Sequence, residues 1–296
     1  MTGNGLTGPS AERRVLAGLV GSGIGPSLTP ALHEHEGDAQ GMRYLYQRLD
    51  LDVLGLGADD VGRVLDATRL AGFRGLNLTH PVKQAVLPHL ASLADDAAAL
   101  GAVNTVVFTP DGAVGHNTDW SGFARSLRSG LPGAALDKVV LLGAGGAGAA
   151  VAHALVRVGV GHLVVADADG ARADALAASL RADLGASAST AAPDGVPSAL
   201  SGADGLVHAT PTGMAAHPGS PVPLEVLEPG LWVADIVYRP LETPLVRAAR
   251  ARGLRVLDGG GMAVGQAVDA FRLFTGAEPD ADRMLAHFTR LVADRP

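Results

Sequence analysis

The stretch "KVVLLGAGGAGAAVAHALVRVG", Lys138 to Gly159, decides the fold of this chain. It begins with the apolar run "VVLL", continues with glycines in a G-x-G-x-x-G spacing and ends in an alanine-rich segment. This order predicts a buried strand, a tight turn and a helix whose first backbone N–H groups can hold a pyrophosphate. The same letters also fit a strand-to-helix turn without a ligand, because glycine and alanine are abundant in the chain.

An acidic residue lies where a bound dinucleotide would need one. The run "HLVVADAD" predicts the next strand of the same unit and places Asp167 about 20 residues after the glycines. A carboxylate there can accept hydrogen bonds from the ribose hydroxyls of NAD and would repel the 2′-phosphate of NADP. We therefore expect NAD as the cofactor. Arg172 keeps NADP open as the alternative, since it could stack on adenine, reach a 2′-phosphate or lie solvated on the following helix.

Strand and helix patterns alternate along nearly the whole chain. Before the glycine turn, "VLAGLVGSG", "YLYQRLDL" and "GLNLT" predict strands, "TPALHEHEGDAQG" predicts a helix, and "VNTVVFTPDGAVGHNTD" predicts two strands joined by a turn. After it, "GLVHAT", "LWVADIVY" and "LRVLDGG" predict further strands. We expect an α/β fold with an N-terminal α/β substrate domain, a C-terminal Rossmann-type doubly wound parallel sheet, and a cleft between them.

The expected domain ranges follow from this alternation. Residues 1–14 are expected to form a flexible tail, 15–120 a substrate-binding and catalytic domain, and 121–270 a dinucleotide-binding Rossmann domain. No strand follows the last two helical segments, so residues 271–296 should pack back on the substrate domain. Arg13 and Arg14 resemble a twin-arginine signal, but glycines break the apolar run after them and no A-x-A site follows. We interpret that run as the first strand and expect a cytoplasmic protein.

The composition limits the class of partner. A formal net charge of -7 without a Lys/Arg-rich stretch argues against nucleic acid or an anionic membrane surface as a partner. The absence of cysteine excludes disulfides and a thiol nucleophile. No histidine spacing typical of a metal site occurs, so we predict no metal. A small-molecule substrate is expected, bound by a monomer or a homodimer.

Short polar side chains lie at the expected carboxyl ends of the first domain's strands. Taken singly, each could be a helix cap or a turn residue. Together they mark the edge of an open α/β sheet at which ligands bind. These residues are Ser27, Thr29, Asn77, Thr79, Asn104 and Asp119.

Lys83, in "NLTHPVKQ", stands out because a lysine at the start of a helix opposes the helix dipole. Dehydrogenation requires a group that takes the proton of the reacting hydroxyl, and a lysine near a carboxylate such as Asp119 can do this. The two groups would titrate as a unit. An ordinary salt bridge is the alternative interpretation.

Six motifs resemble those of the shikimate dehydrogenase family, in the family's order, and cover nearly the whole chain from Val15 onward. They are "GSGIGPSLTPALHEHEG", "NLTHPVKQ", "LGAVNTV", "GHNTDWSGF", "HATPTGM" and "GMAVGQAVDAF". Two features resemble the NAD-dependent quinate/shikimate branch. "ADA" replaces the Asn-Arg-Thr run typical of NADP-dependent members after the second Rossmann strand, and the first loop has Ser-Leu-Thr in place of Ser-x-Ser.

The resemblance implies roles for individual residues. Lys83 and Asp119 would be the catalytic pair. Substrate binding is implied for Ser27, Thr29, Asn77, Thr79, Asn104, Tyr238 and Gln266. Cofactor binding is implied for Gly143, Ala144, Gly145, Gly146, Ala147, Gly148, Asp167, Arg172, Thr210, Pro211, Met214, Val237, Gly259 and Met262.

The activity implied by the resemblance is the reversible oxidation of the C3 hydroxyl of quinate or shikimate to the 3-dehydro acid, with hydride transfer to NAD. One alternative is a biosynthetic enzyme that reduces 3-dehydroshikimate, or an amino analogue, with NADPH. A second alternative is a non-catalytic metabolite-sensing module, which would require a lost catalytic residue or an added effector domain. Neither feature is visible in the sequence.

Overall fold

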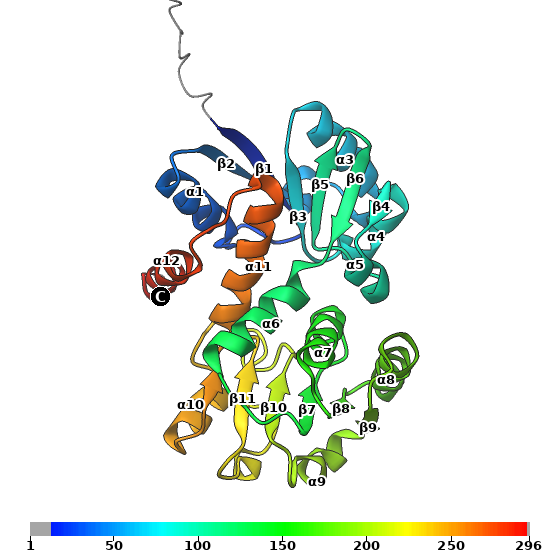
Figure 1. Ribbon diagram of the computed structural model, residues 1–296, viewed down its shortest axis with the longest axis vertical. Helices are drawn as coiled ribbons and strands as arrows, with labels where there is room; N and C mark the ends of the chain where they lie inside the picture. Colours follow the sequence, from blue (N-terminus) through cyan, green and yellow to red (C-terminus); the bar gives the residue numbers. More distant parts are fainter. Residues whose placement is uncertain (1–12, 295–296) are drawn as a thin grey trace, which may run out of the picture. The chain divides into compact units, whose positions relative to one another are not determined.

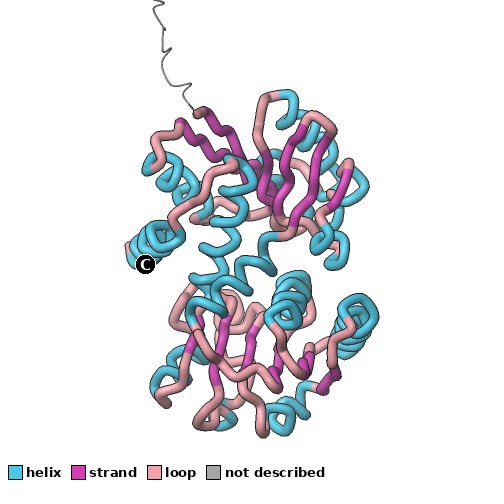
Figure 2. The backbone as a smooth tube through the Cα atoms, in the orientation of Figure 1, coloured by secondary structure: helices cyan, strands magenta, loops and turns pink. Residues whose placement is uncertain are grey.

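The computed structural model describes residues 13–294, so almost all of the expected tail over residues 1–14 lies outside the described residues. The described chain forms two compact units. The first contains residues 13–92, 103–115 and 270–294, and the second contains residues 93–102 and 116–269. Both units are α/β, as Figure 2 shows for each, so the predicted fold class is confirmed.

The first unit is built on a six-stranded mixed sheet in the order β2-β1-β3-β5-β6-β4. β1 pairs in parallel with β2 and β3, whereas β5 runs antiparallel to β3. The turn at Pro110 and Asp111 between β5 and β6 is the one predicted from the sequence. The strands are β1 (Arg14–Gly21), β2 (Arg43–Asp50), β3 (Gly75–Leu78), β4 (Ser92–Leu93), β5 (Thr105–Thr109) and β6 (Gly112–His116).

Helices complete the first unit around this sheet (Figure 1). Alternate side chains of β1 and β2 are buried with Phe271 and Phe274, which lie on the last turns of a long helix near the C-terminus. Pro30 occupies the first turn of its helix, where a proline is tolerated. The helices are α1 (Thr29–Ala39), α2 (Leu51–Leu54), η1 (Ala58–Asp60), α3 (Val61–Leu70), α4 (Val82–Ala85), η2 (Leu87–His89), the end of α11 (Gly259–Thr275) and α12 (Ala281–Ala293).

An ion pair of a buried glutamate with a partly exposed arginine holds α12 beside α1, where Figure 1 shows both helices. Glu36 of α1 is fully buried and accepts hydrogen bonds from Nε and Nη2 of Arg283 at 2.8 and 2.7 Å. It also accepts bonds from the Asp280 amide and the Gln40 side chain. These bonds satisfy a charge that would be costly to bury alone. They fix the C-terminal helix on the first unit.

The second unit contains a six-stranded sheet in the order β12-β11-β10-β7-β8-β9, whose neighbouring strands pair in parallel. The order reverses at β7, as in a doubly wound fold. The strands are β7 (Lys138–Leu142), β8 (His162–Ala166), β9 (Ala188–Ala191), β10 (Gly205–His208), β11 (Trp232–Asp235) and β12 (Val256–Leu257).

Successive residues of β7 face two different layers of helices. Val139 and Leu141 pack with α6, α7 and α8, whereas Val140 and Leu142 pack with α9 and α10. This period of two explains why the sequence shows an unbroken apolar run, since both faces of the strand are buried. The helices are α5 (Asp95–Leu100), α6 (Thr118–Gly130), α7 (Gly146–Val158), α8 (Gly170–Leu184), η3 (Pro193–Gly195), α9 (Val196–Leu200), η4 (Leu224–Val226), α10 (Pro244–Ala251) and most of α11.

The segment Leu93–Ala102 groups with the second unit, although it precedes the glycine turn by some 40 residues. Its helix α5 carries Asp96, whose carboxylate lies 2.9 Å from Nε2 of His153 and 3.5 Å from Nη2 of Arg157 on α7. These side-chain contacts join α5 to a helix of the second unit that is far from it in sequence.

The structure differs from the predicted elements at several places. The strand predicted over "LRVLDGG" is confined to Val256–Leu257, and the helix α11 already begins at Gly259. A Cβ at Gly259 would lie 2.4 Å from the carbonyl oxygen of Val237, and one at Gly261 would lie 2.0 Å from Oγ of Ser126. These glycines therefore serve close packing and not a turn. The two-residue strand β4 was also not predicted, being too short for a period to show.

Candidate active site

The glycine turn joins β7 to α7 in the second unit. Gly143 has a φ of +105°, and a Cβ there would lie 2.6 Å from the carbonyl oxygen of Ala209. A Cβ at Gly148 would lie 1.9 Å from the carbonyl oxygen of Gly143. Both positions therefore require glycine, one for its backbone conformation and one for the close approach of the helix to the strand. The turn places the N-terminus of α7 at the carboxyl end of β7.

Asp167 follows β8 and is hydrogen-bonded to this turn. One carboxylate oxygen accepts the amide of Ala144 at 2.7 Å, and the other accepts the amide of Asp169 at 2.8 Å. Each oxygen retains a further lone pair, so the carboxylate can still accept a bond from a ligand. Arg172 is exposed on α8 and forms a 3.2 Å ion pair with Asp169. Its charge is therefore already matched by a carboxylate.

The next strands bring a buried polar network to the same edge of the sheet. His208 ends β10 and pairs in register with Asp235 of β11, and both side chains are fully buried. Nδ1 of His208 lies 3.0 Å from Asp235, and Nε2 lies 2.5 Å from Oγ1 of Thr210. Oγ1 of Thr243 donates to the other oxygen of Asp235. The network fixes the start of the "HATPTGM" loop, which carries Pro211 and Met214.

Several remaining cofactor residues lie after β11 and on α11. The amide of Val237 donates to Asp235 at 2.9 Å, and the carbonyl of Val237 lies against Gly259. Met262 packs against the apolar core of the unit. Tyr238, which the resemblance assigns to the substrate, follows Val237 and is 42% exposed. These positions follow the carboxyl ends of β11 and β12, so they lie at the same end of the sheet as the glycine turn.

Asp119 and Gln266 lie on two helices of the second unit that cross at close range. Asn117 caps α6 by accepting the amide of Asp119 at 3.1 Å. A Cβ at Gly122 would lie 2.4 Å from the amide nitrogen of Gln266, and one at Gly265 would lie 2.6 Å from the carbonyl of Gly122. The two glycines therefore let the backbones of α6 and α11 touch, and this contact sets the place of Gln266 relative to Asp119.

In the first unit, the loop after β1 and the end of β3 come together. The amide of Ser22 donates to the carbonyl of His80 at 2.9 Å, and the amide of Thr79 donates to Val20. The hydroxyls of Ser27 and Thr29 lie 3.2 Å apart at the start of α1. The carboxyl ends of β1 and β3 thus form one edge of the sheet, as expected for a ligand site.

Asn77 and Asn104 are both buried and connected to each other. Nδ2 of Asn77 donates to Oγ1 of Thr105 at 2.9 Å, and Thr105 donates to Oδ1 of Asn104 at 3.0 Å. The amide of Leu78 donates to the carbonyl of Asn104 at 2.7 Å. The structure therefore brings these two predicted residues together at the junction of β3 and β5.

Lys83 is half-buried on α4, and its carbonyl accepts the amide of Val103 at 2.9 Å. Lys83 is the second residue of α4, which has only four residues, so the dipole that its charge would oppose is small. It lies two residues after the cis His80-Pro81 bond, and its carbonyl is bonded to the segment that leads to Asn104.

The candidate residues fall into two groups by unit. The first unit holds Ser27, Thr29, Asn77, Thr79, Lys83 and Asn104, and the second holds Asp119, Gly143 to Gly148, Asp167, Arg172, Thr210, Pro211, Met214, Val237, Tyr238, Gly259, Met262 and Gln266.

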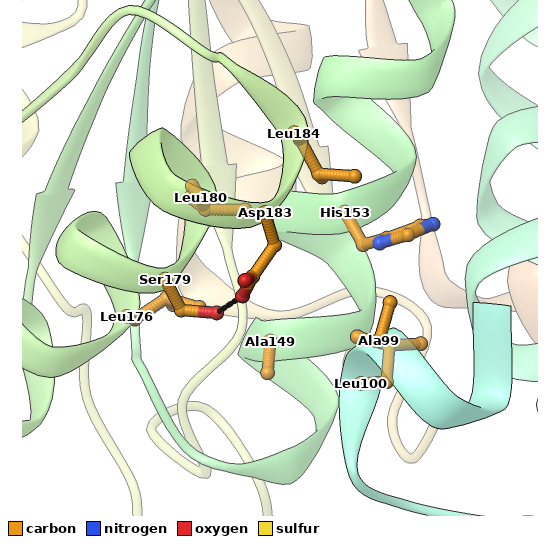
Figure 3. Close-up of a pocket in the computed structure, with 9 residues that line it drawn as sticks. All are labelled: Ala99, Leu100, Ala149, His153, Leu176, Ser179, Leu180, Asp183 and Leu184. Atoms are coloured by element: carbon orange, nitrogen blue, oxygen red, sulfur yellow. Dashed lines mark hydrogen bonds between the residues drawn. The ribbon is translucent and has the colours of Figure 1, made fainter. Parts of the chain in front are cut away.

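A separate pocket in the second unit lies between α5, α7 and α8 (Figure 3). It has a volume of about 50 Å³ and is lined by mostly apolar side chains, with His153 and the bonded pair of Ser179 and Asp183 among them. None of the candidate residues lines this pocket. It is too small for a dinucleotide or a cyclic acid.

Comparisons with known proteins decide the family. A family model described as the shikimate dehydrogenase substrate binding domain matches residues 19–106, and one described as the shikimate 5'-dehydrogenase C-terminal domain matches residues 259–287. The chain is 63% identical over 278 residues to a Streptomyces avermitilis protein named shikimate dehydrogenase (NADP(+)), covering 94% of this chain and 96% of that protein. This chain belongs to the shikimate dehydrogenase family. It is therefore an oxidoreductase with a nicotinamide cofactor.

Other members of the shikimate dehydrogenase family differ in the cofactor that their names give. A Corynebacterium efficiens protein named quinate/shikimate dehydrogenase (NAD(+)) is 53% identical over 279 residues, covering 94% of this chain and 98% of that protein. The solved structure described as quinate dehydrogenase from Corynebacterium glutamicum in complex with NAD is 49% identical, with a TM-score of 0.90 over 94% of this chain and 100% of that one. Family membership alone therefore leaves NAD and NADP both open.

The residues at the end of β7 fit the dinucleotide that the shikimate dehydrogenase family uses. A Cβ at Gly145 or Gly146 would meet no atom within 4 Å, so the space beside the start of α7 is open. A ligand can therefore approach the first backbone N–H groups of this 13-residue helix, where an anion is favoured.

Residues 13–294 contain no helix with the length and apolar character of a membrane span.

Three residues that hold candidate site residues in place were not predicted from the sequence. Tyr46 donates to Asn77 at 2.6 Å, and His208 and Asp235 hold the loop of Thr210. The alternating pattern of β2 and the apolar context of "GLVHAT" could have indicated buried polar groups at Tyr46 and His208. Which partners those groups find depends on strands distant in sequence, and the pattern does not contain that information.

Proposed function

We propose that this protein is a quinate/shikimate dehydrogenase that oxidises the C3 hydroxyl of its substrate reversibly to the 3-dehydro acid, with NAD as the hydride acceptor. The observation that carries the NAD assignment is the position of Asp167, whose carboxylate is bonded to the glycine turn at the end of β8. The names of the Corynebacterium relatives support the substrate class. The reaction is proposed to take place in the cytoplasm, and the oligomeric state stays a prediction.

The electrostatics near Asp167 favour NAD over NADP. Asp167 and Asp169 contribute two carboxylates at the end of β8, and Arg172 is paired with one of them. A 2′-phosphate placed there would add negative charge to a site that already has an excess of it. Two free hydroxyls on the ribose can instead donate to the carboxylate of Asp167.

The proton transfer is assigned to Lys83 and Asp119. Bound nicotinamide supplies the hydride-accepting carbon. The ammonium of Lys83 would donate to the substrate oxygen when the ketone is reduced, and its amine would accept the hydroxyl proton during oxidation. Asp119, with its amide capped by Asn117, would stabilise the charged ammonium.

Substrate recognition is assigned to seven polar residues. Ser27, Thr29 and Tyr238 carry hydroxyls, which suit a carboxylate or a ring hydroxyl as partner. Carboxamides and hydroxyls can each donate and accept, so they suit the hydroxyl groups of a polyhydroxylated ring. These residues are Asn77, Thr79, Asn104 and Gln266.

A second candidate function is the reduction of 3-dehydroshikimate with NADPH. The specific observation in its favour is the 63% identity to the Streptomyces avermitilis protein, whose name gives NADP(+). The two candidates share the site and differ in cofactor and direction.

A steady-state matrix of quinate and shikimate against NAD and NADP tests the proposal. We expect kcat/KM with NAD to exceed that with NADP by about tenfold or more for at least one acid, which corresponds to one favourable charged hydrogen bond. An NADP preference for both acids would favour the second candidate. The absence of any rate with either acid would overturn both.

A further inference from the structure

Tyr46 is a buried tyrosine whose hydroxyl reaches the substrate-side carboxamide of Asn77. Its side chain is 7% exposed, and its hydroxyl donates to Oδ1 of Asn77 at 2.6 Å. A buried phenol needs a hydrogen-bond partner, and this one finds it two strands away. The bond therefore links the edge strand β2 to the end of β3.

The strand register explains how the phenol reaches so far. Tyr46 lies opposite Ala17 of β1, and Ala17 lies opposite Gly75 of β3. Ala17 and Gly75 leave room on this face of the sheet, and Asn77 follows Gly75 by two residues, so it points to the same face. Phe274 covers this region, since a Cβ at Gly75 would lie 2.5 Å from its ring. The side chain of Tyr46 therefore extends across β1 to reach β3, and the ring of Phe274 packs over the same region.

The phenol fixes which end of the Asn77 carboxamide faces it. Burial raises the pKa of Tyr46 well above its ordinary value, so the hydroxyl stays protonated. A carboxamide has one accepting end and one donating end, and the hydroxyl bonds to the accepting oxygen. Nδ2 of Asn77 consequently points to Thr105, whose hydroxyl accepts from it and donates to Oδ1 of Asn104. In this series of three hydrogen bonds, the donor and acceptor of each bond determine those of the next.

We propose that Tyr46 is a positioning residue for substrate recognition: through Asn77 and Thr105 it sets the orientation of the two carboxamides, Asn77 and Asn104, that bind the ring hydroxyls. The inference rests on the proposed function, since that function assigns substrate binding to Asn77 and Asn104. It names Tyr46 and Thr105 as residues on which substrate affinity depends, although neither is assigned to contact the substrate.

Tyr44 provides a matched comparison on the same strand. It lies two residues before Tyr46, is 4% exposed, and its hydroxyl lies 3.0 Å from Nδ1 of His33. Its ring stacks on Phe271. Burial lowers the pKa of His33 to about 3, so its imidazole is neutral. Tyr44 thus shares the strand, face, burial and single hydroxyl bond of Tyr46, but its bond leads to α1 and not to the carboxamides.

The test compares Tyr46→Phe with Tyr44→Phe in the full-length enzyme. We expect Tyr46→Phe to raise KM for quinate or shikimate about fivefold to tenfold, as expected when a recognition group loses a fixed orientation, with KM for the nicotinamide cofactor changed less than about twofold. Tyr44→Phe should lower the melting temperature by a similar amount and leave both KM values within about twofold. The split between substrate and cofactor KM is a readout that a loss of stability alone would not produce.

Thr105→Val tests the next bond of the chain with a side chain of nearly the same shape. It should raise the substrate KM in the same way as Tyr46→Phe, and it keeps the inference testable if Tyr46→Phe does not fold. In a double variant, the two changes should be less than additive in kcat/KM because they break the same chain. Wild-type enzyme without activity on either acid would overturn the proposed function together with this inference. An active wild type whose substrate KM is unchanged in both variants would overturn this inference alone.

Discussion

The carboxylate of Asp167 accepts the backbone amide of Ala144 at 2.7 Å, so the residue expected to bind the ribose also holds the glycine turn in place. The two roles are compatible because a carboxylate has more lone pairs than the two amide bonds use. The shape of the pyrophosphate site and the choice of cofactor therefore depend on one side chain. A substitution at Asp167 should affect both.

Asp167→Asn should shift the cofactor preference toward NADP. Removing the negative charge lessens the repulsion of a 2′-phosphate and weakens the bonds to the ribose of NAD, so the ratio of kcat/KM for NAD to that for NADP should fall about tenfold or more. Steady-state kinetics with both cofactors at saturating acid measures this ratio. Asp183→Asn is the control. It also removes one carboxylate charge, but from a residue of α8 that bonds Ser179 and is not assigned to the cofactor. An unchanged ratio in Asp167→Asn would contradict the NAD assignment.

Lys83→Ala should lower kcat by about 10²- to 10⁴-fold, the usual effect of removing a positioned acid or base. Cofactor binding should be nearly unchanged, because the assigned cofactor residues lie on other elements. Titration of cofactor fluorescence and stopped-flow turnover separate the two effects. Lys138→Ala is the matched control: Lys138 is the chain's other lysine, and it donates to the carbonyl of Ser201. Retention of at least a tenth of the rate in Lys83→Ala would exclude Lys83 as the proton-transfer group.

The elements with strong periods were predictable from the sequence, and so was the glycine turn. An apolar run, a glycine spacing and an alanine-rich segment predicted β7, β8 and α7. These patterns depend on local backbone conformation and on burial, both of which are visible in the sequence. The strand predicted over "LRVLDGG" was too long at its end, because Gly259 already belongs to α11. Gly259 and Gly261 permit the close approach of Val237 and Ser126. Glycine marks a turn or a close contact equally well, and only the folded chain tells which.

Candidate site residues could be named from the sequence, whereas the bonds among them could not. Asn77 and Asn104 follow from their places at strand ends and from the family resemblance. Their connection through Thr105, and the support of Asn77 by Tyr46, depend on the lateral order of β2, β1, β3 and β5. A linear pattern specifies strands, whereas the order of strands in a sheet is set by crossovers that bring distant segments together.

Gly122→Ala should destabilise the second unit and disturb Gln266. The added Cβ would lie 2.4 Å from the amide nitrogen of Gln266, and backbone atoms cannot move aside cheaply. We expect a loss of about 1–3 kcal/mol in the free energy of unfolding and a higher KM for the acid. Urea denaturation and steady-state kinetics measure the two quantities. Gly170→Ala is the control, since a Cβ there meets no atom within 4 Å at the start of α8. Equal stability of both variants would contradict the close crossing of α6 and α11.

The ion pair of the buried Glu36 with Arg283 should make the stability of the enzyme depend on pH below about 5. Burial acts to raise the pKa of Glu36, but the hydrogen bonds from Arg283, the Asp280 amide and Gln40 outweigh it, so the pKa lies below its ordinary value of 4.5. A carboxylate with a lowered folded-state pKa contributes stability that is complete above the unfolded-state pKa and is lost as the pH falls through the folded-state pKa. The contribution of Glu36 should therefore be constant from pH 5 to 7 and decline below about pH 4.5.

Glu36→Gln removes this contribution at neutral pH. It leaves the guanidinium of Arg283, which is 34% exposed and still paired with Asp280, next to a neutral amide, so the variant should lose about 1–2 kcal/mol in the free energy of unfolding at pH 7. Its stability should also fall less steeply than that of the wild type between pH 5 and 3. Glu278→Gln is the control: it breaks an ion pair with Arg272 whose glutamate is 70% exposed, and this should cost less than about 1 kcal/mol. Urea denaturation of the three proteins from pH 7 to 3 measures these differences. If the wild type and Glu36→Gln showed the same pH profile, Glu36 would not be the carboxylate that anchors α12 to α1.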